Sequence, residues 1–256
     1  MLFKSFKITF IPVLVLLGFS PNLLAQSQKT GDQKPPVPKV GIFDSGRGGF
    51  SVLKEITRQM PYVEAYYIAD QAYFPYGDLE SWQIKERCLA LTQELIKEDV
   101  DLVVIACNTA TITALPFLEQ RFAIPFIGVE PLANYEPSDQ KGKSILVLTT
   151  PVTGNSQRFR ELKRRLEPEN QITQFSCPNM ARIVESFIDN PSLPRLISAV
   201  KEELAALKGQ KFDEVVLGCT HYAHIASVIS LVVQAKHVTA NSYIACLVKN
   251  ALSEIF

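Results

Sequence analysis

Two stretches with one pattern decide the fold: Asp101-Leu-Val-Val-Ile-Ala-Cys107 and Asp213-Glu-Val-Val-Leu-Gly-Cys219. Each begins with an aspartate, continues as a short apolar run, and reaches a cysteine six residues later. A short run that is apolar on both faces is typical of a strand buried in a parallel sheet. The repeat therefore predicts two related α/β halves, each with one cysteine at the carboxyl end of a strand.

Apolar runs alternate with amphipathic stretches around this repeat. The strands are expected at Lys39–Phe43, Ala65–Ile68, Leu102–Ala106, Phe126–Val129, Ser144–Leu148 and Glu214–Leu217. The helices are expected at Ser51–Gln59, Trp82–Glu98, Gln157–Leu166, Leu193–Leu207 and Ala223–Gln234, with one more after Cys107, so that a helix follows each repeat cysteine. This alternation predicts an α/β fold of two pseudo-symmetric, doubly wound domains with parallel sheets. Ligands of such sheets bind beyond the carboxyl ends of the strands, so we place the active site in the cleft between the domains.

Composition excludes several classes of protein. Hydrophobic residues make up 47% of the 256 residues, which is enough for a sizeable core. The 26 Lys and Arg balance the 26 Asp and Glu, and no basic run with interleaved aromatic residues is present. A nucleic-acid partner is therefore not expected.

The first 25 residues have the layout of a secretory signal peptide. Lys4 and Lys7 precede an apolar stretch from Ile8 to Phe19, and Ala25 ends a candidate cleavage site. The alternative is a permanent anchor, but Pro12 interrupts the stretch, which is shorter than the roughly 20 residues a membrane span needs. Residues 26–38 then read as a Pro-rich linker. We expect an exported, periplasmic protein with no membrane span after cleavage, or a cytoplasmic one if the leader does not function.

The number and spacing of the cysteines argue against export. The five cysteines are widely spaced, and an odd number leaves at least one without an internal partner. Such spacing is more typical of an intracellular enzyme than of a disulfide scaffold. Cys88, Cys177 and Cys246 are most simply core residues.

Two thiols on opposite walls of one cleft suit the transfer of a proton at carbon. One thiolate can remove a proton from one face while the other thiol protonates the opposite face. The reference pKa of cysteine is roughly 8.5, so neighbouring groups must set which thiol is ionised. Neutral donors for a carboxylate follow the predicted strands at Ser45, Asn108, Thr109 and Thr220.

Five motifs in order resemble those of the bacterial glutamate racemases, in the aspartate/glutamate racemase superfamily. They are Phe43-Asp-Ser-Gly-Arg-Gly-Gly-Phe-Ser-Val-Leu53, Ala69-Asp-Gln-Ala-Tyr-Phe-Pro-Tyr-Gly77, Ala106-Cys-Asn-Thr-Ala110, Ile127-Gly-Val-Glu-Pro131 and Gly218-Cys-Thr-His-Tyr222. The resemblance extends from about Val40 to the C-terminus. It implies that the C-terminal segment returns to the first domain, so that residues 39–130 and 241–256 form domain 1 and residues 131–240 form domain 2.

The resemblance also implies roles for individual residues. Cys107 and Cys219 would be the acid/base pair of a racemisation that needs no cofactor and no metal. Asp44, Glu185 and His221 would tune the two thiols. The substrate would be held by residues of both domains: Asp44, Ser45, Asp70, Tyr76, Gly77, Asn108, Thr109, Thr220 and His221.

Other interpretations of these motifs are weaker. Gly46, Gly48 and Gly49 fit neither the dinucleotide nor the P-loop spacing, so a phosphate loop is not favoured. His221 and His224 stand three apart without the frame of a zinc site. Arg47 occupies a position where the family usually has an apolar residue, and this departure concerns substrate preference or contacts more than the reaction.

We therefore predict an isomerase that interconverts L- and D-glutamate by a two-base mechanism, supplying D-glutamate for peptidoglycan and so for cell-wall biogenesis and cell shape. We expect a homodimer. One alternative is a racemase for aspartate or for a broader set of amino acids. Another is a periplasmic amino-acid-binding protein without turnover, in which Cys107 and Cys219 form a disulfide.

Overall fold

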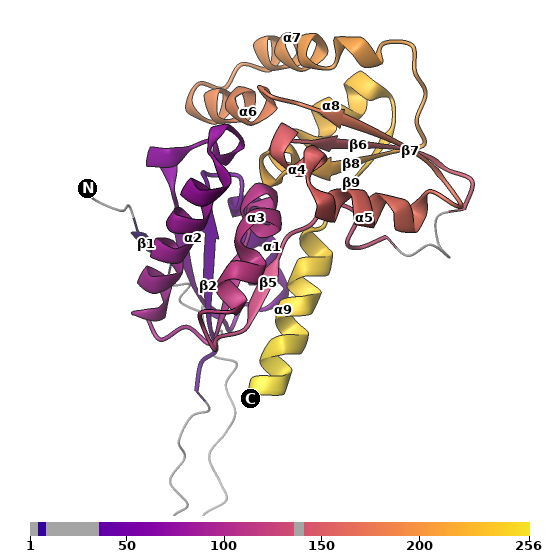
Figure 1. Cartoon of the computed structure of the whole chain (residues 1–256). Coiled ribbons are helices and arrows are strands. Elements are labelled where there is room, and N and C mark those ends of the chain that lie inside the picture. Colours follow the sequence, from indigo (N-terminus) through magenta and orange to yellow (C-terminus); the bar gives the residue numbers. More distant parts are fainter. Residues whose placement is uncertain (1–4, 9–35, 136–140) are drawn as a thin grey trace, which may run out of the picture.

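A computed structural model describes residues 5–8, 36–135 and 141–256 of the chain. Two sheets with helices on their faces follow one another along the sequence (Figure 1). The predicted α/β fold of two pseudo-symmetric domains is confirmed. The linker predicted at residues 26–38 lies almost wholly outside the described residues, which resume at residue 36.

The first sheet has five strands in the order β1-β3-β2-β4-β5. They are β1 (Ser5–Ile8), β2 (Lys39–Asp44), β3 (Glu64–Ala69), β4 (Leu102–Ile105) and β5 (Phe126–Gly128). The neighbouring strands are parallel except β1 and β3, which are antiparallel. Most of the predicted leader lies outside the described residues, but its segment Ser5–Ile8 forms this edge strand. Removal of the leader would therefore leave β3 at the edge.

The second sheet has four parallel strands in the order β7-β6-β8-β9. They are β6 (Ser144–Thr149), β7 (Gln171–Ser176), β8 (Glu214–Gly218) and β9 (Lys236–Val238). This order repeats that of β3-β2-β4-β5, so β4 and β8 occupy equivalent places. The two cysteines of the sequence repeat follow these two strands.

The aspartates of the repeat have a structural function. The Asp101 carboxylate accepts a hydrogen bond from the Lys39 backbone N–H at 2.7 Å, and the Asp213 carboxylate accepts one from the Ser144 N–H at 2.8 Å. In each domain, the residue that opens the cysteine-bearing strand thus anchors the start of the neighbouring central strand. The repeat couples a strand anchor at one end to a thiol at the other.

Helices cover both faces of each sheet. They are α1 (Phe50–Gln59), α2 (Ser81–Ile96), α3 (Asn108–Glu119), α4 (Pro151–Asn155), α5 (Gln157–Leu166), α6 (Met180–Asp189), α7 (Leu193–Glu203), α8 (Ala226–Val233) and α9 (Asn241–Ile255). Short 3-10 helices are η1 (Gln71–Tyr73), η2 (Tyr76–Asp78), η4 (Ala205–Leu207) and η5 (Thr220–Ile225). None of the helices within the described ranges is long and apolar enough to cross a membrane.

The C-terminal helix packs on the first sheet. Ile244, Ala245 and Val248 of α9 share one buried cluster with Val40 of β2 and Val52 of α1. Figure 1 shows α9 running beside β5 after the chain leaves the second sheet. The last element of the chain therefore completes the core of the first sheet.

The structure differs from the expected elements in several places. Strands β7 and β9 are missing from the predicted set. Strand β7 has only two apolar residues among six, and β9 has three residues, two of them exposed. Helices α4, α6 and α9 are also missing from the predicted set. Cys246, expected in the core, is exposed on α9, whereas Cys88 and Cys177 are buried. The helix predicted at Leu193–Leu207 ends at Glu203 and continues as a 3-10 turn. The helix predicted from Ala223 begins as η5, and only Ala226–Val233 is α-helical.

Candidate active site

The two repeat cysteines lie buried at the carboxyl ends of equivalent strands. Cys107 follows β4 and caps α3, and Cys219 follows β8 and precedes η5. Their exposed fractions are 6% and 8%. The sulfurs are close enough for the charge of one to affect the other, since Cys107 contributes to the raised pKa of Cys219. The structure therefore brings the two thiols into one enclosed site.

The surroundings of Cys107 favour the protonated thiol. Burial, with the nearby Asp44 carboxylate, raises the pKa of Cys107 to about 12. Its sulfur lies 3.6 Å from the Ser45 hydroxyl and accepts the Ala110 N–H at 3.4 Å, in the first turn of α3. The N-terminus of α3 favours a thiolate, but desolvation outweighs it in this enclosed state.

Cys219 lies beside His221, whose other ring nitrogen contacts Glu185. Burial raises the pKa of this thiol well above its usual range. Its sulfur is 3.9 Å from His221 Nδ1, while His221 Nε2 is 2.8 Å from Glu185 Oε1. Burial alone would raise the pKa of Glu185, but hydrogen bonds from His221 and the Arg47 backbone lower it to about 2. The ionised Glu185 carboxylate can only accept a hydrogen bond, so His221 Nε2 carries the ring proton. The unprotonated Nδ1 then faces Cys219.

The glycines after β2 allow the first domain to approach this histidine. A Cβ on Gly48 would lie 2.3 Å from His221 Nδ1, and one on Gly46 would lie 2.7 Å from Glu185 Oε1. The Gly48 N–H is 3.2 Å from Nε2, a contact that would become a hydrogen bond only in the other tautomer. The glycine-rich motif is thus explained by close contact between domains.

Asp44 joins the two domains across the site. It is fully buried, accepts the Gly46 N–H at 2.7 Å, and accepts the Thr220 hydroxyl of the second domain at 2.9 Å. Burial raises the pKa of Asp44, although the nearby His221 opposes the rise. A carboxyl group with a raised pKa next to two thiols is suited to take up or return a proton.

Polar groups at the start of α3 offer contacts for a charged ligand. Asn108 Nδ2 donates to the Val129 carbonyl at 3.0 Å, which leaves its buried Oδ1 without a partner. The Thr109 hydroxyl is 3.0 Å from that of Thr150 and 3.3 Å from that of Thr153. The unpaired Asn108 oxygen suits an ammonium group, because a buried acceptor left unpaired is costly.

The polar atoms of Asp70 and Tyr76 are already engaged. The Tyr76 hydroxyl donates to Asp70 Oδ2 at 2.7 Å, and Arg87 donates to both Asp70 oxygens at 2.8 and 2.9 Å. These side chains support the wall of the site. A Cβ on Gly77 would lie 3.8 Å from Thr150, so this glycine faces the second domain.

The structure adds residues that sequence reasoning missed. Thr150, the N-cap of α4, and Thr153 within α4 both contact Thr109, and Arg47 contacts Glu185. A signal for Thr150 exists in the sequence, because Leu146–Gly154 leads from the first strand of its half into a helix as Gly41–Gly49 does in the other half. No comparable signal identifies the partner of Arg47, which comes from the other domain.

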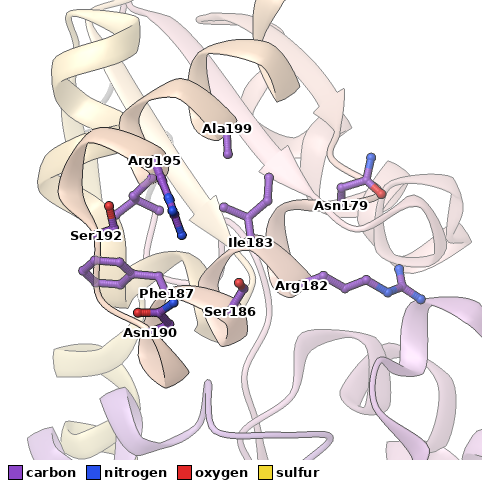
Figure 2. Close-up of a pocket in the computed structure, with 10 residues that line it drawn as sticks. Asn179, Arg182, Ile183, Ser186, Phe187, Asn190, Ser192, Arg195 and Ala199 are labelled. Atoms are coloured by element: carbon purple, nitrogen blue, oxygen red, sulfur yellow. The ribbon is translucent and has the colours of Figure 1, made fainter.

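One cavity away from this site lies in the second domain. A cavity of about 320 Å³ between α6 and α7 is lined by Arg182, Ile183, Phe187 and Arg195, among others, and by none of the predicted site residues (Figure 2). Among residues 5–8, 36–135 and 141–256, no group of three or more His, Cys, Asp or Glu side chains is placed to hold a metal ion.

Two α/β domains that each contribute one buried strand-end thiol to an enclosed site have the architecture of a racemase. The sequence model of the Asp/Glu/Hydantoin racemase family matches residues 52–246, and the chain belongs to this family.

Individual relatives are glutamate racemases. The chain is 36% identical to glutamate racemase of Streptococcus pneumoniae over 209 residues, which cover 81% of this chain and 78% of the relative. It is 35% identical to that of Leptospira interrogans over 191 residues, or 75% and 73% of the two chains.

Solved structures agree with the sequence comparisons. Escherichia coli glutamate racemase, solved with L-glutamate and the activator UDP-MurNAc-ala, superposes with a TM-score of 0.78 and 31% identity over 85% of this chain and 83% of the other. Picrophilus torridus aspartate racemase gives a TM-score of 0.57 at 19% identity over 84% of this chain and 94% of the other, which shows a shared fold.

Proposed function

We propose that this chain interconverts L-glutamate and D-glutamate with Cys107 and Cys219 as the two bases. The observation that carries the proposal is the placement of two buried thiols after equivalent strands of two pseudo-symmetric sheets. Glutamate is preferred as the substrate because the relatives at 31 to 36% identity are glutamate racemases.

The proton steps follow from this arrangement. One cysteine, as thiolate, takes the α-proton of the bound amino acid and becomes a thiol, leaving a planar carbanion. The other cysteine donates its thiol proton to the opposite face of that carbon and becomes a thiolate. Inversion therefore exchanges the protonation states of Cys107 and Cys219, and the reverse reaction restores them.

In either direction, the cysteine that acts as the base needs a group that accepts its proton before the reaction starts. His221 Nδ1, at 3.9 Å, serves Cys219, with Glu185 fixing the ring. Asp44 is the candidate on the Cys107 side, because it ends β2 directly after Phe43, whose carbonyl accepts the N–H of the residue before Cys107 at 2.8 Å. The ammonium group of the substrate adds a positive charge to the enclosed site and so favours ionisation of a thiol.

The substrate would be bound by neutral donors and one free acceptor. The unpaired Asn108 Oδ1 would accept from the ammonium group. Hydroxyls from both domains, those of Ser45, Thr109, Thr150 and Thr220, would donate to the carboxylates. Asp70 and Tyr76 would support this binding indirectly, through the wall they form with Arg87.

The test uses the reduced protein in D2O with L-glutamate and, separately, L-aspartate. NMR follows exchange of the α-proton, and circular dichroism follows optical activity. We expect exchange and loss of optical activity with glutamate. Exchange with aspartate alone would reassign the substrate, and no exchange with either acid in a folded, reduced sample would favour the binding-protein alternative.

We further propose the two-domain division at residues 39–130 with 241–256 and at 131–240, a homodimer, and supply of D-glutamate for peptidoglycan. The packing of α9 on α1 supports the division.

The apolar leader supports export to the periplasm, where the thiols would have to stay reduced. Mass spectrometry of the mature chain would test the leader, and light scattering would test the dimer.

A further inference from the structure

Arg47 extends from the loop after β2 to helix α6 of the second domain. Its guanidinium forms ion pairs with two carboxylates, that of Glu185 and that of Asp189, the latter at 2.7 Å. Its backbone N–H also donates to Glu185 Oε1 at 2.8 Å. One residue of the first domain thus holds Glu185 by main chain and side chain together.

The two ion pairs differ in burial. The Glu185 side chain is 9% exposed, that of Arg47 26%, and that of Asp189 66%. A largely buried, charge-assisted pair is strong and directional, whereas an exposed pair contributes little. The Glu185 contact therefore carries the interaction, and Asp189 steadies the guanidinium from outside.

The same Glu185 oxygen that accepts the Arg47 N–H also accepts His221 Nε2. The order of contacts is Arg47, Glu185, His221 and then Cys219, and it crosses from one domain to the other and ends at one thiol. Cys107 has no such sequence of charged groups in the described part of the chain; its sulfur contacts Ser45 and Ala110.

We propose that Arg47 is a positioning residue that holds Glu185 against His221 and thereby prepares Cys219, and not Cys107, for proton transfer. This inference rests on the proposed racemisation. It makes the two thiols unequal in their support, although the sequence repeat places them alike.

The inequality has a measurable form. The two enantiomers have equal free energies in water, so kcat/KM must change equally in both directions in any variant. The primary isotope effect measured with α-deuterated substrate, in contrast, can change by different amounts for the two enantiomers. If Arg47→Met slows the step at Cys219, the isotope effect rises for the enantiomer that Cys219 deprotonates. It falls for the other enantiomer, because reprotonation by Cys219 then limits the rate.

The experiment compares Arg47→Met and Arg47→Lys with matched controls. Arg58→Met removes an ion pair within one helix, with Glu55. Arg182→Met removes a second interdomain pair, with Asp78, that does not touch Glu185; Figure 2 shows Arg182 pointing from α6 toward the first domain. Arg47→Met should lower kcat/KM ~10- to 100-fold with opposite changes in the two isotope effects, Arg47→Lys should restore part of the rate, and the controls should leave both isotope effects unchanged.

A second readout does not depend on turnover. The chain has three histidines, so 15N NMR can resolve the ring of His221. The wild-type ring should carry its proton on Nε2, and Arg47→Met should give a mixture of tautomers. An unchanged His221 spectrum, or isotope effects that move in the same direction for both enantiomers, would overturn the role of Arg47. A wild-type protein that shows the Nε2 tautomer but no α-proton exchange would instead overturn the proposed function.

Discussion

At the scale of single residues, the site is defined by thiols that are protonated in the enclosed state. Burial raises the pKa of Cys107 to about 12 and that of Cys219 well above its usual range. A thiol with a raised pKa is neutral below that value, so the thiolate form gains population only as the pH rises. Substrate must therefore change the ionisation of the site on binding.

Alkylation rates measure directly how far the two site thiols are protonated. Without substrate, iodoacetamide should modify the exposed Cys246 readily near pH 8, whereas Cys107 and Cys219 should react slowly and accelerate as the pH rises toward 11 or so. Peptide mass spectrometry after timed quenching gives the three rates. Equal rates for all three cysteines at pH 8 would show that the site thiols are neither buried nor raised in pKa.

Gly48 is a residue whose lack of a side chain matters. A Cβ there would lie 2.3 Å from His221 Nδ1, a distance that real contacts do not reach. Gly48→Ala should displace His221 from Cys219 and lower kcat/KM ~100-fold while the far-UV dichroism stays native. Steady-state kinetics in both directions check this, and wild-type rates in the alanine variant would mean that the domains do not approach so closely in the active protein.

At the scale of elements, the strand that carries each cysteine is anchored at its other end by an aspartate. Asp101 and Asp213 each accept the backbone N–H of the first residue of a neighbouring strand, Lys39 and Ser144. The Asp101 bond is partly buried and the Asp213 bond is exposed. Their contributions to stability should differ accordingly.

Asp101→Ala should reduce the free energy of unfolding by about 1–3 kcal/mol and Asp213→Ala by about half as much, because a charge-assisted hydrogen bond is weakened by water. Urea unfolding measures both values. The specific activity of the folded fraction should not change, because neither carboxylate lies at the site. Loss of activity without loss of stability would assign these aspartates to the chemistry.

The sequence predicts an element well where its pattern of apolar residues is clear. The central strands are continuous apolar runs, and their bounds are predicted to within one residue. Strand β7 has only two apolar residues, Ile172 and Phe175, which do not alternate with polar ones, and β9 is three residues long, so neither shows a strand pattern in the sequence. The repeat does predict the two cysteine positions, since a strand followed by a helix places them at the same edge of each sheet.

At the scale of the whole molecule, the site exists only where the domains meet. Asp44 accepts from Thr220, Thr109 contacts Thr150, and Arg47 binds Glu185, so each pair joins residues far apart in the chain. Such pairings cannot be read from local sequence, which explains why Thr153 and the pairing of Arg47 with Glu185 escape it. The enclosed thiols require both domains to be in place.

The most direct test concerns the claim that Cys107 and Cys219, one from each domain, act on opposite faces of the α-carbon. Cys107→Ala and Cys219→Ala are prepared as full chains, and each is incubated in D2O with L-glutamate and, separately, D-glutamate. NMR follows α-proton exchange and circular dichroism follows racemisation. The account predicts that neither variant racemises either enantiomer, and that any exchange that survives is confined to one enantiomer, a different one in each variant. Racemisation at a rate near that of the wild type in either variant would contradict the two-thiol mechanism.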